Sequence, residues 1–369
     1  MNKKGLDAAA LSIRSLAMDA IQKAKSGHPG MPLGCAELGA SLYGELLNHN
    51  PEKPNWINRD RFVLSAGHAS MLLYSVLYMS GYNISLDDIK QFRQLGSKTP
   101  GHPEVGVTEG VDASTGPLGQ GISMAVGMAM AETMLASRFN TPTHKIIDHY
   151  TYALCGEGCL MEGISHEMGS LAGHLKLGKL IVFYDQNEVS IDGPTSITFT
   201  EDIGKRFESY GWQVLKGSMY NYDDIFNLTE KAKANTEQPT LIMLKSEIGH
   251  GAPTVAGLSS SHGAPIGEDG VKEAKKFLGL NPDEYFYVAP EAYQYFADQK
   301  SRWSSNYNNW KADFDAWAKE NPELKKEWDC AMNNQAIAPL TNLPTYTTSD
   351  KLATRVASGN AIQAIAASY

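Results

Sequence analysis

The sequence predicts an α/β protein with a doubly wound, mostly parallel sheet, helices on both faces, and a C-terminal helical segment and linker. Short apolar runs alternate with stretches of helical spacing, and polar or glycine-rich turns follow most of the runs. The composition is that of a globular protein, with 42% hydrophobic and 20% charged residues. The runs expected to form strands are residues 61–64, 150–154, 180–184, 212–215 and 240–244.

The chain opens with two predicted helices. Apolar residues at helical spacing predict the first over residues 6–25. Glycine and proline in residues 26–30 end it and leave His28 on a loop. The second is expected over residues 35–47.

Two kinds of turn after or beside the strands suggest anion and cation binding. The glycine-rich residues 116–121 precede an apolar helix that runs to about residue 135, and such a turn lets backbone N–H groups approach an anion. Gly156, Glu157 and Gly158 follow one strand, and residues 185–187 follow the next. A carboxylate and an amide oxygen at neighbouring strand ends suit a hard cation.

Four histidines lie beside glycine on predicted loops, where core packing explains them poorly: His28, His68, His102 and His262. Imidazole exchanges protons near neutral pH, so we interpret them as part of a polar pocket for a hydroxylated substrate. Their spacing does not fit a zinc site with short ligand pairs. Cys155 and Cys159 have no matching second pair, and we interpret them as core residues.

The C-terminal part has a different character. Residues 291–333 are aromatic and charged and predict a pair of helices, whereas proline and threonine in residues 335–349 predict a linker. Helical spacing resumes in residues 350–369. We therefore expect domain boundaries that separate residues 1–334, 335–349 and 350–369, the last being the start of a domain that does not continue.

Charge and hydropathy exclude two function classes. A net charge of −9 argues against a nucleic-acid surface. We find no apolar run of signal-peptide or membrane-spanning length, and few cysteines, so we expect no membrane partner and a cytoplasmic protein.

Several motifs, in register, resemble the transketolase family. They lie at residues 25–30, 60–65, 98–104, 116–121, 161–167 and 261–265, and the match continues to residue 360. The resemblance implies transfer of a two-carbon ketol group from a ketose phosphate such as xylulose 5-phosphate to an aldose phosphate such as ribose 5-phosphate, in the pentose phosphate pathway. It also implies thiamine diphosphate with Mg²⁺ or Ca²⁺, and a homodimer in the full-length enzyme.

The resemblance assigns roles residue by residue. Residues 1–334 would form the diphosphate-binding domain and residues 350–369 the start of the pyrimidine-binding domain. Catalytic roles fall to His28, His102 and His262, and substrate contacts to His28, His262 and Arg355. The cofactor would be bound by His68, Gly116, Pro117, Leu118, Gly158, Glu162, Asn187 and His262, and the metal by Glu157, Asn187 and the carbonyl of Val189.

One motif departs from the family, which usually has aspartate where this chain has Glu157. The extra methylene is expected to affect the metal distance or the metal preference. Two alternatives remain open: a non-catalytic or split-subunit module that binds the diphosphate, and an enzyme like dihydroxyacetone synthase. We expect that this chain alone is incomplete and needs the pyrimidine-binding half for catalysis.

Overall fold

The computed structural model describes residues 1–335 and 342–367. The chain forms two compact units. The first comprises Met1–Arg138 and Ile147–Trp310, and the second comprises Phe139–Ile146 and Lys311–Tyr369.

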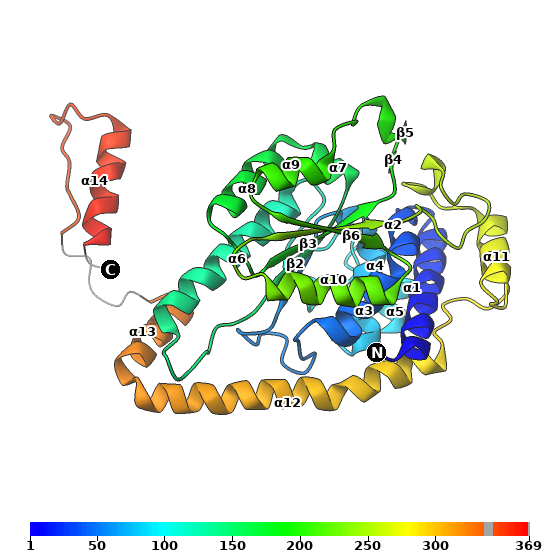
Figure 1. The fold of residues 1–369 in the computed structure, drawn as a ribbon, viewed down its shortest axis with the longest axis horizontal. Coiled ribbons are helices and arrows are strands. Elements are labelled where there is room, and N and C mark those ends of the chain that lie inside the picture. Colours follow the sequence, from blue (N-terminus) through cyan, green and yellow to red (C-terminus); the bar gives the residue numbers. More distant parts are fainter. Residues whose placement is uncertain (336–341, 368–369) are drawn as a thin grey trace. The chain divides into compact units, whose positions relative to one another are not determined.

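The first unit is built on a sheet of five parallel strands in the order β1-β2-β3-β7-β6 (Figure 1). All five predicted strands are present, which confirms the predicted α/β class. Their bounds are β1 Arg61–Leu64, β2 Thr151–Gly156, β3 Leu180–Gln186, β6 Gln213–Ser218 and β7 Thr240–Lys245. A short hairpin of β4 Val189–Ser190 and β5 Gly193–Pro194 follows β3.

The interior strands are apolar on both faces because helices cover both sides of the sheet. Every residue of β2 and all but the last of β3 are buried, while the edge strand β6 is largely half-buried. Figure 1 shows α8 and α9 on one side of the sheet and α10 on the other. The helices that precede the long C-terminal ones are α1 Lys3–Ala24, α2 Gly30–Gly34, α3 Ala36–Ser41, α4 Ser70–Ser80, α5 Leu86–Lys90, α6 Gln120–Phe139, α7 Glu157–Met161, α8 Gly163–His174, α9 Ile203–Ser209, α10 Tyr222–Ala234 and α11 Glu268–Phe277.

The N-terminal helices differ partly from the prediction. Helix α1 begins at an Asn2 cap and ends at Lys25, which has a left-handed φ of 51°, close to the predicted end. The helix expected over residues 35–47 is present at Ala36–Leu46, but its second half is a π-helical turn. The sequence did not predict the short helix α2, which precedes α3 and is separated from it at Cys35. Cys35 has a non-helical φ of −111°, so α2 and α3 do not form one continuous helix.

The glycine-rich turn brings the start of α6 against the end of β1. A Cβ atom at Gly121 would lie 2.4 Å from the Cα of Ser65, so only glycine allows this approach. The Ile122 backbone N–H donates a hydrogen bond of 3.0 Å to Ser65 Oγ. The turn therefore has a packing function besides any contact with an anion.

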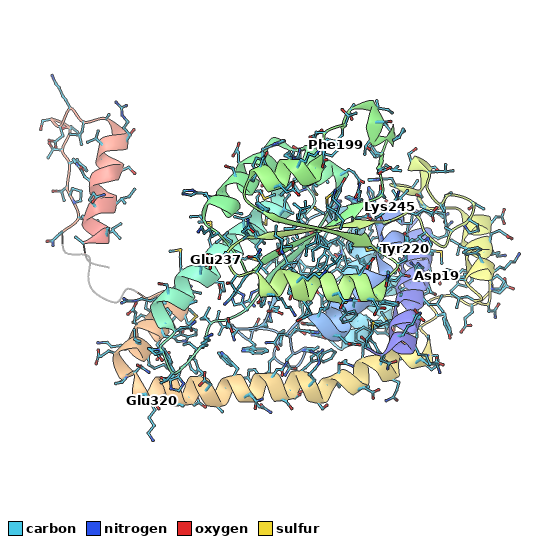
Figure 2. The ribbon with its side chains drawn as sticks, in the orientation of Figure 1. Asp19, Phe199, Tyr220, Glu237, Lys245 and Glu320 are labelled. Atoms are coloured by element: carbon cyan, nitrogen blue, oxygen red, sulfur yellow. The ribbon has the colours of Figure 1, made fainter. Side chains whose placement is uncertain are left out.

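A buried ion pair joins α1 to α11. Asp19 on α1, labelled in Figure 2, and Lys275 on α11 have fully buried side chains with 2.7 Å between Oδ1 and Nζ. The Phe286 backbone N–H donates to the other carboxylate oxygen of Asp19 at 2.6 Å, and Lys275 Nζ donates to the Glu284 carbonyl at 2.7 Å. Both charges are thus compensated, as a buried pair requires.

The predicted pair of C-terminal helices is present as α12 Pro290–Glu320 and α13 Pro322–Met332. In the first unit, Trp303 is buried with its ring 4.6 Å from that of His49. In the second unit, Trp317 and Trp328 pack with ring centroids 5.9 Å apart. The aromatic spacing of this segment therefore marks core positions.

The last described segment agrees with the expected linker and helix. Residues 342–353 contain no helix or strand, and α14 spans Thr354–Ala366. Pro339, part of the predicted linker, lies outside the described residues. The expected domain boundaries at residues 334 and 350 stay predictions.

The predicted core cysteines are buried and reduced, since Cys155 and Cys159 form no disulfide. Among the described helices, none has the length and apolar character needed to cross a membrane.

Candidate functional site

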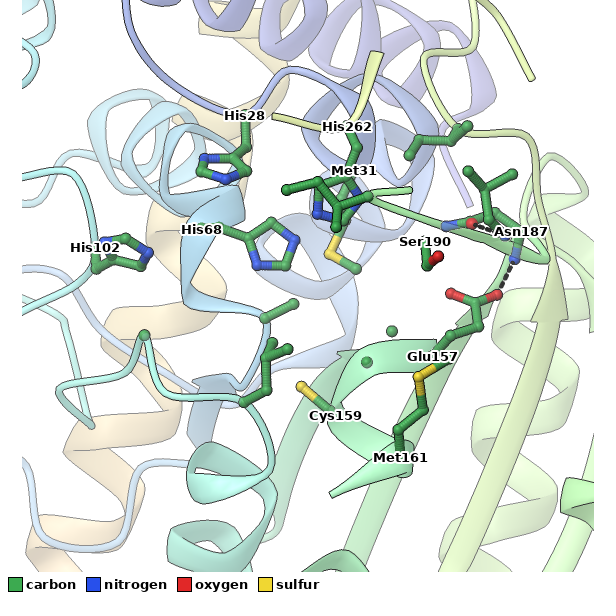
Figure 3. A pocket seen from close by; sticks show the side chains of 18 residues that line it. His28, Met31, His68, His102, Glu157, Cys159, Met161, Asn187, Ser190 and His262 are labelled. Atoms are coloured by element: carbon green, nitrogen blue, oxygen red, sulfur yellow. Dashed lines mark hydrogen bonds between the residues drawn. The ribbon is translucent and has the colours of Figure 1, made fainter. Parts of the chain in front are cut away.

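One cavity of about 360 Å³ opens beside the carboxyl ends of β1, β2, β3 and β7, where ligands bind in open α/β sheets. Figure 3 shows four histidines toward one end and Glu157 with Asn187 toward the other. The cavity is lined by His28, Met31, Ala66, His68, His102, Gly116, Leu118, Gly156, Glu157, Gly158, Cys159, Met161, Asn187, Val189, Ser190, Ile191, Ile248 and His262.

The four histidines come from four separate segments, three loops and the 3-10 turn Gly67–Ala69 that carries His68, and form one cluster. The ring of His28 lies 5.0 Å from that of His68, 6.3 Å from His102 and 5.8 Å from His262, measured between centroids. The rings of His68 and His262 are 5.0 Å apart. The glycines beside these residues leave room for the rings: a Cβ atom at Gly263 would lie 3.3 Å from His28.

Burial keeps the imidazoles of this cluster neutral. It lowers the pKa of His28 to about 4, and the repulsion that a protonated His28 would meet from Arg93, and from His262 and His102 once they are protonated, lowers it further. Burial also lowers the pKa of His68, His102 and His262. The buried Nδ1 of His28 has no hydrogen-bond partner among the described residues. A neutral imidazole with a free nitrogen can bind a hydroxyl group or exchange its proton.

At the other end of the cavity, Glu157 binds the backbone that follows β3. Its Oε1 accepts hydrogen bonds from the N–H of Asn187 at 2.8 Å and of Glu188 at 2.6 Å. The Asn187 side chain donates to Asp185 Oδ2 at 2.9 Å, and its Oδ1 accepts from the Val189 N–H at 3.0 Å. The expected proximity of Glu157 and Asn187 at one sheet edge is therefore found.

These residues do not form the turns expected from the sequence. Gly156 is the last residue of β2 and Glu157 the first of α7, and Asp185 and Gln186 still belong to β3. The strands continue because Gly156 pairs with Asp185, and Asp185 with Leu244, in parallel register. Glu157 and Asn187 are thus the residues that directly follow β2 and β3.

The buried carboxylates at this edge suit a cation. Burial, and then the negative charge of Asp185, raise the pKa of Glu157 above its ordinary value, and burial raises the pKa of Asp185. In residues 1–335 and 342–367, no lysine or arginine forms an ion pair with either carboxylate. No group of three or more His, Cys, Asp or Glu side chains in those ranges could hold a metal. A hard cation here would need amide, carbonyl or ligand oxygens besides Glu157.

Most of the predicted site residues lie together, and three do not line the cavity. The predicted residues that do line it are His28, His68, His102, Gly116, Leu118, Glu157, Gly158, Asn187, Val189 and His262. Pro117 and Glu162 are outside the lining. Glu162 lies between α7 and α8 and is the N-cap residue of α8, without a side-chain hydrogen bond to that helix. Arg355 is the second residue of α14, in the second unit.

Sequence reasoning missed mainly the apolar part of the lining. Met31 and Ile248 have apolar side chains, which do not mark a binding site in a sequence. The one available hint is that Met31 lies three residues after His28. Cys159 was assigned to the core only. The other lining residues that were missed are Ala66, Gly156, Met161, Ser190 and Ile191.

Comparison with known proteins identifies the family. Residues 6–337 match the model of the transketolase thiamine diphosphate binding domain. The chain is 57% identical over 369 residues to a transketolase of Treponema pallidum, covering 99% of this chain and 56% of that protein. It is 51% identical to a transketolase of Geobacillus stearothermophilus, covering 96% and 54%. The chain thus spans about half the length of the curated relatives it matches.

Solved structures agree in fold. Transketolase from Leishmania mexicana has a TM-score of 0.94 at 40% identity, over 98% of this chain and 54% of that one. A Pichia stipitis transketolase in complex with sedoheptulose-7-phosphate has a TM-score of 0.93 at 42% identity, over 99% and 54%. By the family model and by its identity to these relatives, this chain belongs to the transketolase family.

Proposed function

We propose that this chain supplies the thiamine-diphosphate-binding part of a transketolase. The reaction is the reversible transfer of a two-carbon ketol group from a ketose phosphate, such as xylulose 5-phosphate, to an aldose phosphate, such as ribose 5-phosphate, in the pentose phosphate pathway. The supporting observation is one cavity that combines a histidine cluster with a carboxylate–amide pair, in a member of this family. Because the relatives are nearly twice as long, the activity is proposed for a protein that also contains the region they have in addition.

The carboxylate end of the cavity would hold the cofactor diphosphate and its metal. Glu157, the Asn187 amide oxygen and the Val189 carbonyl would bind Mg²⁺ or Ca²⁺, and phosphate oxygens would complete the coordination. His68 and Gly158 would line the diphosphate, with Gly116, Leu118 and His262 also contacting the cofactor. Pro117 and Glu162 are the weakest members of this set, since neither lines the cavity. When bound, thiamine diphosphate supplies the electron sink for breaking the ketose carbon–carbon bond.

The histidine end would receive the sugar. His28, His102 and His262 are neutral near pH 7, so each can accept a proton from a sugar hydroxyl or donate one through its other ring nitrogen. The ring of His28 lies 6.3 Å from that of His102 and 5.8 Å from that of His262, so the cluster can bind neighbouring hydroxyls of one substrate. The Pichia stipitis transketolase forms a complex with sedoheptulose-7-phosphate, a sugar phosphate, and this supports the same substrate class here.

Three further assignments belong to the same proposal. Arg355 would bind the substrate phosphate, for which a guanidinium fork is suited. The complete protein would be a cytoplasmic homodimer. Residues 1–334 would be the diphosphate-binding domain, 335–349 the linker, and the residues from 350 onward the start of the pyrimidine-binding domain.

The test compares two proteins: the 369-residue chain, and the same chain extended by the additional region of the Treponema pallidum relative. We expect the chain alone to bind thiamine diphosphate weakly and only with Mg²⁺ or Ca²⁺, measured by calorimetry. Ketol transfer from xylulose 5-phosphate to ribose 5-phosphate should require the extended protein, because the chain alone cannot enclose the whole cofactor.

Asn187→Ala serves as the variant that should lose metal-dependent cofactor binding, with Asn235→Ala at the C-terminal end of α10 as its matched control. Metal-independent binding in the wild-type chain would contradict the metal assignment. Turnover by the chain alone, at the rate of the extended protein, would show that the second half is not needed. Use of formaldehyde as the better acceptor would favour a dihydroxyacetone synthase.

A further inference from the structure

Arg93 lies between the two loops that carry His28 and His102. Its Nη1 donates a hydrogen bond of 2.8 Å to Ser26 Oγ, two residues before His28. On the other loop, a Cβ atom built at Gly101 would lie 3.0 Å from Arg93 Nε and 3.1 Å from Cζ. Gly101 directly precedes His102, so the guanidinium packs on the backbone beside this second histidine.

The two histidine loops border open space. An open hollow of about 800 Å³ lies beside them and is lined by Ser26, Arg93, Gly101 and His102, among others. His102 lines both this hollow and the candidate site. Helix α4 holds the His102 loop alone: Tyr74 Oη donates to the His102 carbonyl at 3.2 Å, and Ser70 Oγ donates to the Gly101 carbonyl at 2.9 Å. The guanidinium, in contrast, contacts both loops.

Arg93 itself is held rigidly. Its backbone has a left-handed φ of 61°, and its N–H donates to the Thr99 carbonyl at 2.9 Å, which closes the loop between them. The preceding ring of Phe92 is buried, and the guanidinium carbon lies 5.6 Å from its centroid. A side chain anchored in this way can transmit a fixed position to what it contacts.

We infer that Arg93 is a positioning residue for the candidate site, which ties the loop of His28 to the loop of His102 and fixes the 6.3 Å separation of the two rings. The expected effect on kcat rests on the proposed function, whereas the expected effect on the two histidines does not. Arg93 does not line the candidate site, so it acts through the two histidines.

The guanidinium charge adds an electrostatic effect. His28 faces His262, His102, His68 and Arg93, and the positive charge of Arg93 is among the causes that lower its pKa. His102 faces Arg93, which lowers its pKa, and Glu104, which raises it. Removing the guanidinium should therefore let both imidazoles take up a proton at higher pH.

The test uses Arg93→Lys, which keeps the charge but not the planar fork, and Arg93→Gln, which loses both. Histidine titration in the 369-residue chain is followed by NMR, and ketol transfer is measured in the extended protein. We expect Arg93→Gln to raise the pH at which His28 and His102 titrate, and Arg93→Lys to keep it. Both variants should lower kcat about tenfold to a hundredfold with little change in KM, because reacting groups are displaced.

Lys98→Gln is the matched control, since it removes a positive charge from the same loop and its side chain pairs with Asp88 instead. Wild-type titration and wild-type kcat in Arg93→Gln would overturn the inference, as would an equal titration shift in Lys98→Gln. If the wild-type extended protein transfers no ketol group, the proposed function fails. The titration of the cofactor-free chain would still decide whether Arg93 acts on the two histidines.

Discussion

His28 and His262 lie on loops, are half-buried, and pack mainly against other imidazoles and glycine. Side chains in such a setting contribute little to the hydrophobic core. Their ring nitrogens instead face the cavity in which the sugar is proposed to bind (Figure 3). A substitution at either position should therefore separate activity from folding.

His28→Ala and His262→Ala should each lower ketol transfer by ~10²–10⁴-fold in the extended protein, the usual cost of losing a general acid or base. The melting temperature should change little. His174→Ala, an exposed histidine on α8, is the control. Wild-type turnover in both variants, at saturating donor and acceptor, would show that these histidines take no part in the reaction.

Glu157 is one methylene longer than the aspartate usual in the family, and its Oε1 is already held by two backbone N–H groups. Ca²⁺ accepts longer and less regular oxygen ligation than Mg²⁺. We expect the wild-type chain to favour Ca²⁺ over Mg²⁺ in cofactor binding more than Glu157→Asp does. Calorimetric titration of thiamine diphosphate with each metal checks this, and identical metal preferences in the two proteins would disprove it.

Among the helices, α1 and α11 depend on a polar contact that the sequence does not reveal. Asp19 and Lys275 are fully buried, and each is also hydrogen-bonded to backbone. Removing one partner would leave the other charge buried without compensation, and this costs more than the pair contributes.

Lys275→Met should therefore lower the free energy of unfolding by about 3–5 kcal/mol, measured by urea denaturation. Lys276→Met on the same helix removes an exposed lysine that pairs with Glu273, and should change stability little because solvent screens that pair. Adding Asp19→Asn to Lys275→Met should recover part of the loss. Equal destabilisation by the two lysine variants would contradict the role of the buried pair.

For the whole molecule, buried neutral histidines link stability to pH. Burial lowers the pKa of His49 and of His149 to about 3. The unfolded chain protonates both near pH 6.5, whereas the native fold does so only near pH 3. In this pH window the unfolded chain binds protons that the native fold does not. Each of these two histidines therefore lowers the free energy of unfolding as pH falls, by about 1.4 kcal/mol per pH unit.

His49→Gln should remove one of these contributions. The substitution is expected to lower stability at pH 7, since His49 bonds the Tyr82 hydroxyl and the Tyr43 carbonyl. The stability of this variant should nevertheless fall less steeply than that of the wild type between about pH 6 and 4, by about 1.4 kcal/mol per pH unit. Urea denaturation at a series of pH values measures the difference. Parallel pH dependences of the two proteins would rule out the linkage.

Much of the architecture could be predicted because it depends on local pattern. The strands of the parallel sheet are nearly continuous apolar runs, and glycine or proline marks the ends of the helices. The candidate site could be predicted in part because its polar residues follow strands that must end at the same edge. Glu157 and Asn187 meet for this reason.

The α/β class, the strands and the group of polar residues at one sheet edge follow from the amino-acid sequence, since period and turn chemistry are local properties. Which loops approach one another depends on the folded chain. Folding placed Met31 and Ile248 in the cavity, set Arg93 between two histidine loops, and paired Asp19 with Lys275. These contacts join residues far apart in the chain, and their energies depend on burial and geometry, which no local pattern records.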